Sequence, residues 1–560
     1  MSYRALLVTP RDAIRGDIGS TSQRGRRTDA VLDCIPVSGT NRICWATPTF
    51  NLGEDTLTQA IGIDLGTTYS AVALVQAGTP MLIENQDGDQ LTPSVVLIGA
   101  PDDVLVGEMA KRSAALMPSS CVQFVKREMG NANWRFTDPT GAEYTAEQIS
   151  AAILKRLAAG VASRLGEPVT DVVITVPAYF DDTRRKATQD AGAIAGLNVL
   201  RLVNEPTAAA VAYGVTRDKG GLLFVLDLGG GTFDVTLLQA DGTDFDVIAT
   251  DGDRNLGGYN FDNALMAHIN RVVQAEGGPD LTDDAVSAAD LRERAEIAKR
   301  TLTSVPKTQV IVSGKGRTHR IVITRAEFEE MTKPLLDQVE VIVEGVLADA
   351  KVTWSQVDHI LMVGGSTRMP MIPELIRRLS GKTPETGINP DEAVALGAAI
   401  LADKVSAESS GTPPLLDIPL SISDVTSQAL GTLVLAPDGS LYNQVLIRRN
   451  STVPCAEEKV FGTNIPNQEH MISEITEGEG EDPEYVTVLV RKTIPLPPGL
   501  PKGAPMRHIM SYDIDGMVHL EIIDDTSGFT LGEIPLERPL NLKDSEVDAM
   551  RTAMRKLEIQ

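Results

Sequence analysis

Two short stretches of the chain repeat one pattern that suits phosphate and divalent-cation chemistry. Residues 61–70 read IGIDLGTTYS and residues 224–235 read FVLDLGGGTFDV, so an apolar strand leads into Asp, Gly and Thr before strand-like sequence resumes. The aspartates, Asp64 and Asp227, supply hard oxygens that can hold Mg²⁺ through its water molecules. The glycines permit turns whose N–H groups approach phosphate oxygens closely. Either copy alone is compatible with a plain hairpin, but the duplication predicts a nucleotide bound from two sides.

A third glycine element, residues 359–375, reads HILMVGGSTRMPMIPEL. It runs from an apolar strand through Gly364, Gly365 and Ser366 into a helix, whose free N–H groups can face an anion. The planar guanidinium of Arg368 can stack on a purine ring. A strand–Gly–Gly–helix unit alone is common in α/β proteins, but three such loops in one chain favour a nucleotide site. None of the hairpins is a P-loop, because the Lys-Ser/Thr pair and following helix are missing.

The elements that must position these loops fall into successive segments. Helix-like and strand-like sequence alternates from residue 60 to residue 404 and predicts an α/β body. Small polar residues and a Pro pair in VSAESSGTPP predict an interdomain linker over residues 405–416. Short alternating strands with the turn signals APDGS and DIDGM predict an all-β domain over 417–540. The last segment, 541–560, has acids early and bases late and predicts a short helix.

Composition limits the class of protein. The chain has 560 residues, 42% hydrophobic content and a formal charge of −25, which argues against duplex nucleic acid or an anionic membrane as the main partner. Four cysteines without a CxxC pair suit a reducing compartment, and no apolar run reaches the length of a transmembrane helix. A cytoplasmic protein is therefore expected. Residues 1–59 are rich in Arg and small polar residues and predict a largely disordered N-terminal extension.

Several long strings resemble one family, the heat-shock protein 70 (DnaK-type) chaperones, from residue 61 to about residue 540. They are IGIDLGTT, VITVPAYFDDTRRKATQDAGAIAGLNVLRLVNEPTAAAVAYG, VLDLGGGTFDV, ERAEIAKRTLT, VGGSTRMPMI and NPDEAVALGAAI. The resemblance implies a two-lobed, actin-like ATPase domain built from a ribonuclease H-like repeat. It also implies an all-β sandwich that binds polypeptide, followed here by a short C-terminal helix in place of a long helical lid.

The resemblance implies that the chain hydrolyses ATP, a phosphoryl transfer to water that depends on positioning and charge stabilisation. The implied cofactors are ATP or ADP and Mg²⁺, with K⁺ as a further candidate ion. Asp64 and Asp227 would surround Mg²⁺ and the attacking water. Thr232 and Lys126 would contact the γ-phosphate, with Glu205 as the acid beside them. Without the resemblance, Lys126 is interpreted as a surface lysine and Glu205 as an acid in a first helical turn.

The string ERAEIAKRTLT places Glu296, Lys299 and Thr303 on one face of a predicted helix. An ion-paired solvent face is the usual explanation of this pattern, whereas the resemblance directs these residues toward the adenosine. Asp391 can also be a simple helix cap. The nucleotide contacts that the resemblance implies are Gly66, Thr67, Thr68, Tyr69, Gly229, Gly230, Gly231, Glu296, Lys299, Arg300, Thr303, Gly364, Gly365, Ser366, Arg368 and Asp391.

The resemblance also implies binding of unfolded or extended polypeptide clients, together with a J-domain cochaperone and a nucleotide exchange factor. Main-chain hydrogen bonds and an apolar pocket would hold the client, and the family's cleft and arch positions match Phe461, Asn464 and Met471. Communication between nucleotide and client needs an element with two states. The residues that match the family's relay and docking region are Pro177, Arg185, Arg201, Asn204 and Asp417.

The chain departs from the family pattern in ways that leave its function open. Tyr259 and Asn260 stand in GGYNFDN where an acidic pair is common, and residues 541–560 are too short for a full lid. The main hypothesis is an ATP-dependent molecular chaperone of the stress-response type. The alternative is a nucleotide-gated regulatory protein with one specific partner and slow ATPase, and an inactive nucleotide sensor is a third reading.

Overall fold

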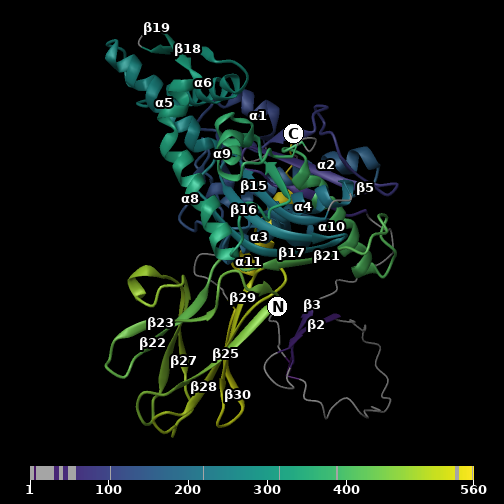
Figure 1. Cartoon of the computed structure of the whole chain (residues 1–560), viewed down its shortest axis with the longest axis vertical. Coiled ribbons are helices and arrows are strands. Elements are labelled where there is room, and N and C mark those ends of the chain that lie inside the picture. Colours follow the sequence, from purple (N-terminus) through teal and green to yellow (C-terminus); the bar gives the residue numbers. More distant parts are fainter. Residues whose placement is uncertain are drawn as a thin grey trace. The chain divides into compact units, whose positions relative to one another are not determined.

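The computed structural model describes residues 6–7, 31–36, 42–47, 59–100, 103–217, 220–314, 316–385, 389–535, 542–557 and 559. The chain divides into two compact units (Figure 1). The α/β unit comprises Thr58–Ser427 and Arg538–Gln560. The β unit comprises Met1–Leu57 and Gln428–Glu537.

The α/β unit is built on two sheets of the same design. In each sheet, two strands joined by a glycine turn pair antiparallel, and a later strand pairs in parallel with the first of them. Strand β4 thus pairs antiparallel with β5 and parallel with β13. In the same way, β15 pairs antiparallel with β16 and parallel with β20. This repeat confirms the predicted two-lobed α/β architecture. The first sheet has the order β14 (Asn198–Asn204), β13 (Asp171–Val176), β4 (Ile61–Asp64), β5 (Tyr69–Gln76) and β6 (Thr79–Leu82). The second has the order β20 (His359–Val363), β15 (Gly221–Leu228), β16 (Phe233–Asp241), β17 (Asp244–Asp253) and β21 (Ser421–Val425).

Short strands complete this unit. β7 (Leu91–Pro93) pairs with β5, and β10 (Cys121–Gln123), β8 (Val95–Ala100) and β9 (Asp103–Val106) form a small sheet in that order. Two hairpins are β11 (Phe136–Thr137) with β12 (Glu143–Tyr144) and β18 (Lys307–Gly314) with β19 (Arg317–Thr324). Two single-turn helices, η1 (Val125–Glu128) and η2 (Gly365–Arg368), carry residues of the candidate site.

Local signals set the helix ends and the helix packing. Thr145 accepts from the N–H of Gln148 in a capping box at the start of α2, which ends at Gly166 with φ +78°. A Cβ on Gly397 would lie 1.8 Å from the carbonyl oxygen of Ala208, so glycine is needed where α10 crosses α4. The helices are α1 (Glu108–Ser113), α2 (Ala146–Leu165), α3 (Asp182–Ala195), α4 (Glu205–Arg217), α5 (Gly258–Ala275), α6 (Ala285–Ser304), α7 (Arg325–Met331), α8 (Lys333–Ala350), α9 (Met371–Ser380), α10 (Ala393–Ser410) and α11 (Asp544–Lys556).

The short C-terminal helix α11 is confirmed, and it packs in the α/β unit beside α3 (Figure 1). Val547 and Met554 are buried in the hydrophobic cluster of the first sheet. Nζ of Lys155 on α2 donates to the carbonyl oxygens of Met554 and Leu557 at 2.7 and 2.6 Å. Nε of Arg551 donates to a carbonyl oxygen at the end of α3, at 2.8 Å. The helix follows the β unit in sequence, as a shortened lid would, but its contacts belong to the α/β unit.

The segment expected to be a linker, 405–416, begins as helix. α10 continues to Ser410 because the first helix-ending residue is Gly411, whose φ is +69° and whose N–H bonds the carbonyl of Ala407. β21 then pairs in parallel with β17. The boundary between the two units falls between Ser427 and Gln428, later than the sequence pattern indicates.

The β unit is a sandwich of two antiparallel four-stranded sheets, and the predicted turns at APDGS and DIDGM join β22 to β23 and β28 to β29. Apolar side chains of both sheets form one core. The first sheet has the order β23 (Leu441–Ile447), β22 (Leu430–Leu435), β26 (His470–Glu477) and β27 (Thr487–Pro495). The second has the order β25 (Cys455–Gly462), β28 (Pro505–Tyr512), β29 (Val518–Asp524) and β30 (Phe529–Pro535). In sequence, the short strand β24 (Thr452–Val453) lies between β23 and β25, and the single turn η3 (Pro483–Tyr485) lies between β26 and β27.

His508 predicts a pH dependence of this unit. It is 3% exposed, and burial lowers the pKa of its ring to about 4. An unfolded chain binds this proton near pH 6.5, so stability is fully present above pH 6.5 and falls as the pH drops toward 4. We expect His508 to lower the free energy of unfolding by about 2 kcal/mol at pH 5.

Urea unfolding followed between pH 5 and pH 7.5 checks this expectation. His508→Leu should flatten the pH dependence of the β-unit transition, while the exposed His470→Leu should leave it unchanged. Equal pH slopes for wild type and His508→Leu would assign the dependence to other groups.

Three short strands lie in the N-terminal segment that was expected to be largely disordered. They are β1 (Leu6–Leu7), β2 (Val31–Pro36) and β3 (Arg42–Thr47), paired antiparallel in the order β1-β3-β2. Apolar, β-rich runs around the turn residues SGTN favour such a hairpin. The rest of the prediction for residues 1–59 lies outside the described residues.

Candidate functional site

The two Asp-Gly-Thr hairpins face each other. A Cβ on Gly230 would lie 1.9 Å from Oγ1 of Thr68, and a Cβ on Gly231 would lie 2.6 Å from the methyl group of Thr67. Side chains larger than hydrogen therefore cannot stand at these two positions without moving the opposite hairpin. The predicted two-sided arrangement is formed by residues 162 and 164 positions apart in sequence, Thr68 with Gly230 and Thr67 with Gly231.

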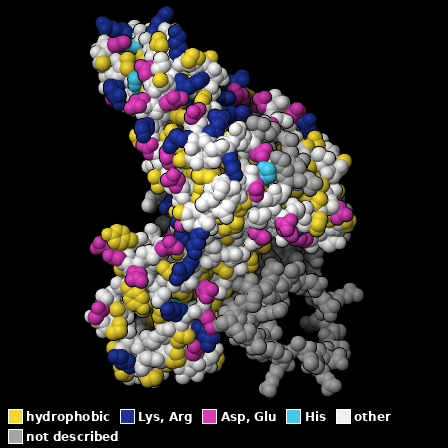
Figure 2. Space-filling view, in the orientation of Figure 1, with side chains coloured by type: hydrophobic (Ala, Val, Ile, Leu, Met, Phe, Trp, Pro, Cys, Tyr) yellow, Lys and Arg dark blue, Asp and Glu magenta, His cyan; other side chains and the backbone are white. Residues whose placement is uncertain are grey.

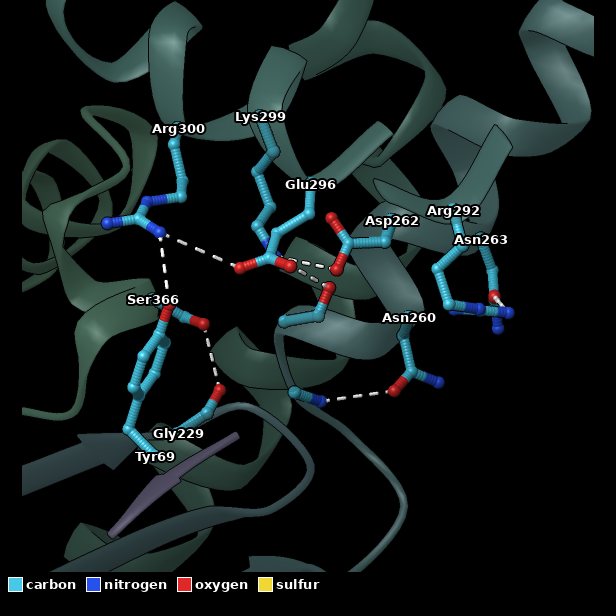
Figure 3. A network of polar contacts seen from close by, with 12 residues as sticks. Tyr69, Gly229, Asn260, Asp262, Asn263, Arg292, Glu296, Lys299, Arg300 and Ser366 are labelled. Carbon is cyan, nitrogen blue, oxygen red and sulfur yellow. Dashed lines mark hydrogen bonds and ion pairs between the residues drawn. The ribbon is translucent and has the colours of Figure 1, made fainter. Parts of the chain in front are cut away.

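The third glycine element packs against the turn of the second Asp-Gly-Thr hairpin. Oγ of Ser366 donates to the carbonyl oxygen of Gly229 at 2.8 Å (Figure 3). Gly364 has φ +81°, and a Cβ there would lie 2.4 Å from the carbonyl oxygen of Leu228. The three loops thus form one glycine-lined cradle, in which backbone can approach a phosphate closely.

A buried group of charged side chains, here called the acidic cluster, lies at the strand ends that carry these loops. Its members are Asp64, Glu205, Asp227 and Asp234 with Lys126, and the last four are each 1–7% exposed. Nζ of Lys126 donates to Oε1 of Glu205. Oδ1 of Asp64 accepts from Oγ1 of Thr175 at 3.2 Å.

Burial makes these carboxyl groups hold protons more tightly. Burial, and next the charge of Glu205, raises the pKa of Asp64 to about 7. The same two causes raise the pKa of Asp234 to about 7. The pKa of Asp227 is raised well above its usual value by burial, then by the charges of Glu205 and Asp234. A nearby cation would reverse these shifts by favouring the charged carboxylates.

The acidic cluster fits a magnesium–nucleotide group. Four carboxyl groups are set against the ammonium group of Lys126, and Oδ2 of Asp234 is buried without a partner among the described residues. Within that described part, no three His, Cys, Asp or Glu side chains lie close enough to bind one metal ion directly. That Asp64 and Asp227 hold an ion through its water molecules stays a prediction.

Figure 3 shows the residues expected near the adenosine bonded to one another. Arg300 donates to the hydroxyl of Tyr69 at 3.3 Å and lies 3.7 Å from Glu296. Glu296 also pairs with Lys111 at 3.1 Å, and Lys111 donates to Tyr69 at 2.9 Å. Because Tyr69 and Lys111 come from the first lobe and α6 from the second, these contacts join the two lobes. Oγ1 of Thr303 bonds only its own helix backbone among the described contacts, at Arg300.

Two further pairs order the neighbouring residues. Lys299 donates to Oδ2 of Asp262 at 2.8 Å and to the carbonyl oxygen of Gly258 at 3.1 Å. Arg368 donates to Oδ2 of Asp391 at 2.6 Å, and Asp391 lies 3.1 Å from the position of a Cβ on Gly365. The charged residues among the expected nucleotide contacts are therefore paired within the structure, whereas among the described residues no hydrogen bond joins the side chain of Thr303 to an expected contact outside its own helix.

The expected relay residues form a connected network in part. Nη2 of Arg185 donates to Oδ1 of Asn204 at 2.6 Å, and Nδ2 of Asn204 donates to Oδ2 of Asp424 at 2.8 Å. The hydroxyl of Thr207 also donates to Asp424, at 3.2 Å. Asp417, which the resemblance placed in this docking region, is exposed.

Pro177 directly follows β13, and its carbonyl oxygen accepts a hydrogen bond from the N–H of Phe180. Nε of Arg185 donates to the carbonyl oxygen of Phe180 at 3.0 Å. Nε of Arg201 is buried without a hydrogen-bond partner among the described residues. Pro177 thus lies in the turn between β13 and α3, and Arg185 on α3 bonds back to that turn.

The residues proposed for the polypeptide site lie on different parts of the β unit. The ring of Phe461 on β25 packs edge-on against His508, with 4.9 Å between ring centroids. Asn464 is exposed, and its N–H bonds the side chain of Gln468 at 2.8 Å. Met471 is partly buried against the sandwich core. Their assignment to a client site stays a prediction.

Sequence reasoning missed Lys111, Asp234 and Asp424. Asp234 carried a signal, because a charged residue interrupts the buried strand of VLDLGGGTFDV. Lys111 and Asp424 meet their partners only through the fold, at sequence separations of 185 and 220.

The comparison with protein families agrees with this geometry. The family model for Hsp70 protein matches residues 60–560. In the part of the chain that the structure describes, no helix combines the length and apolar character needed to cross a membrane. Hsp70 proteins are in general ATP-dependent chaperones that hydrolyse ATP, bind ATP or ADP with Mg²⁺, and act on polypeptide clients with cochaperones. Both the duplicated nucleotide cradle and the match over almost the whole described chain place this protein in the Hsp70 family.

Proposed function

We propose that this chain is an ATP-dependent molecular chaperone that binds and releases unfolded or extended polypeptide segments. One observation carries the proposal: the three glycine loops meet at an acidic cluster that retains Lys126 and its partner Glu205. This arrangement supplies a cradle for phosphate and fixed charge for phosphoryl transfer. ATP binding and hydrolysis in the α/β unit then control how tightly the β unit holds its client.

Each residue of the catalytic set has a separate part. When bound, Mg²⁺ supplies charge neutralisation at the phosphates, and Asp64 and Asp227 hold its water molecules. The ammonium group of Lys126 donates one hydrogen bond to Glu205 and has two more N–H groups that can donate to phosphate oxygens. Thr232 offers its hydroxyl at the end of the second glycine loop and is 6% exposed. K⁺ remains a candidate further ion.

Support for client binding comes from the surface of the β unit. Its edge strands β23, β27, β25 and β30 can add an extended peptide through main-chain hydrogen bonds. Exposed apolar side chains, seen among the yellow surface in Figure 2, favour binding of apolar segments. The large exposed ones in this unit are Leu435, Leu441, Val460, Ile465, Ile472, Tyr485, Val488, Ile514 and Phe529.

The expected coupling gives the decisive experiment. The dissociation rate of a fluorescent peptide from the full chain should be at least about tenfold faster with ATP than with ADP, a difference of about 1.4 kcal/mol in coupling. Asp424→Ala, which removes the acceptor of Asn204 and Thr207, should reduce this ratio. Asp283→Ala serves as the control, because Asp283 is exposed and belongs to none of the predicted sites. Equal rates with ATP and ADP in the wild type would reject the coupling.

One observation favours a second candidate function. The helix that follows the β unit packs in the α/β unit, so it does not act as a lid within the sandwich. A nucleotide-gated regulatory protein that binds one specific partner needs no general client lid. Suppression of aggregation of several unrelated unfolded proteins would favour the chaperone, and binding to a single partner without such suppression would favour the regulator.

Partners and compartment follow from the same proposal. We expect a J-domain cochaperone and a nucleotide exchange factor to act on the α/β unit. Acidic and basic side chains are interspersed over the face shown in Figure 2, and the formal charge of −25 disfavours nucleic acid. Cys121 and Cys455 are free thiols, which suits the proposed cytoplasmic location.

A further inference from the structure

We propose that Tyr259, whose ring lies within cation–π distance of both Arg127 and Arg292, is a latch between the two lobes that sets the rate of nucleotide release. The inference rests on the proposed nucleotide binding and concerns a residue outside the acidic cluster and the glycine loops. Tyr259 is also one of the two positions at which this chain lacks the acidic pair common in the family.

Two guanidinium groups and one aromatic ring contact the side chain of Tyr259, and this group of contacts is here called the stack. The guanidinium carbon of Arg127 lies 4.5 Å from the centroid of the Tyr259 ring, and that of Arg292 lies 4.4 Å from it. The ring of Phe124 meets Tyr259 edge-on, with 4.9 Å between centroids, and Arg292 lies 5.6 Å from the Phe124 ring. All three distances to guanidinium groups fall within the range of cation–π attraction.

The stack joins elements of different lobes. Phe124 and Arg127 belong to the segment around η1 in the first lobe, whereas Tyr259 begins α5 and Arg292 lies on α6. Figure 1 shows α5 and α6 running with the β18–β19 hairpin to one end of the α/β unit. A nucleotide held between the lobes can leave only when this end moves away from the first lobe. That movement breaks the contacts of Tyr259 with Phe124 and Arg127.

Hydrogen bonds align Arg127 and Arg292 on the ring. Arg127 donates to Oδ1 of Asn260 at 3.2 Å and lies 3.4 Å from the carbonyl oxygen of Asn255. Arg292 donates to Oδ1 of Asn263 at 2.9 Å (Figure 3), while its Nη1 is buried without a hydrogen-bond partner among the described residues. Among the described residues, no hydrogen bond holds the Nη1 end of the Arg292 guanidinium group, and the face of the Tyr259 ring attracts this group instead.

The chemistry of the latch differs from that of an ion pair. Arg127 and Arg292 repel each other, and the ring of Tyr259 attracts both guanidinium groups. An aromatic ring carries no net charge, so dissolved salt screens these contacts less than it screens an exposed ion pair. The structure thus assigns Tyr259 a lobe contact that persists at high ionic strength.

Release of a fluorescent ADP, measured by stopped flow on the full chain, tests the proposal. Tyr259→Leu should release ADP about tenfold faster, which corresponds to about 1.4 kcal/mol. Tyr259→Phe, which keeps the ring, should stay within about twofold of wild type. Arg294→Ala is the matched control, because Arg294 is also on α6 but pairs with Asp290 at its surface. An unchanged release rate in Tyr259→Leu overturns the latch.

A salt series separates the latch from general loosening. Tyr259→Glu replaces the ring with a carboxylate between two guanidinium groups, so its release rate relative to wild type should rise as salt increases from 50 to 500 mM. A ratio that does not change with salt contradicts the charge argument. Equilibrium binding of ADP to wild type is measured first: no binding there rejects the proposed function, whereas binding with equal release from Tyr259→Leu rejects the latch alone.

Discussion

Replacing Lys126 with Met is expected to lower the steady-state rate of ATP hydrolysis by at least about 100-fold, because one preorganised cation at a developing phosphate charge has about this effect. ATP affinity should change much less, since the glycine cradle and the residues toward the adenosine remain. The measurement is phosphate release at saturating ATP, with the dissociation constant for ATP determined separately. Met fills nearly the volume of the lysine stem without its charge.

The control for Lys126→Met must account for the partner that is left behind. Removing one member of a buried ion pair leaves an unpaired buried group, which destabilises a protein by several kcal/mol. Lys186→Met provides a matched loss, because Lys186 pairs at 2.5 Å with Asp190, which is 3% exposed and remote from the glycine loops in sequence. Reduced turnover in both variants would indicate a loss of folded protein. Full turnover in Lys126→Met with an intact fold would remove Lys126 from the catalytic set.

The local part of the site could be predicted from sequence. A turn that only glycine can form leaves a short, recognisable pattern in the sequence, and this pattern identifies Asp64, Asp227 and the glycines beside them. The duplication then implied two facing hairpins, and the structure brings Gly230 against Thr68. The family resemblance supplied Lys126, which no local pattern marks as buried.

Contacts made by tertiary packing were beyond the sequence. Asp424 accepts a hydrogen bond from Asn204 because β21 pairs with β17 in a register that no spacing rule fixes. The segment expected to be a linker from residue 405 begins as helix for a different reason: small polar residues favour a linker, yet helix continues until Gly411 provides a left-handed cap. Long-range pairing decided the first outcome, and a local glycine cap decided the second.

The position of α11 predicts a large effect on stability from a residue far from the nucleotide site. Val547→Asp should detach α11 from α2 and α3 and lower the free energy of unfolding of the α/β unit by about 3 kcal/mol or more. Val547 is 6% exposed within the cluster of the first sheet, so the new carboxylate would be buried without a partner or would expel the helix. Ala549→Asp is the control on an exposed position of the same helix.

Hydrogen exchange distinguishes a docked helix from a free lid. If α11 belongs to the α/β unit, Val547→Asp should raise amide exchange in α2 and α3, because Lys155 on α2 and the end of α3 make hydrogen bonds to α11. Ala549→Asp should leave this exchange near the wild-type rate. A free lid would give the same exchange in both variants. Segment 428–537 is flanked in sequence by β21 and α11, which both belong to the α/β unit. Protection of α11 that differs between ATP and ADP would show that this helix responds to the bound nucleotide.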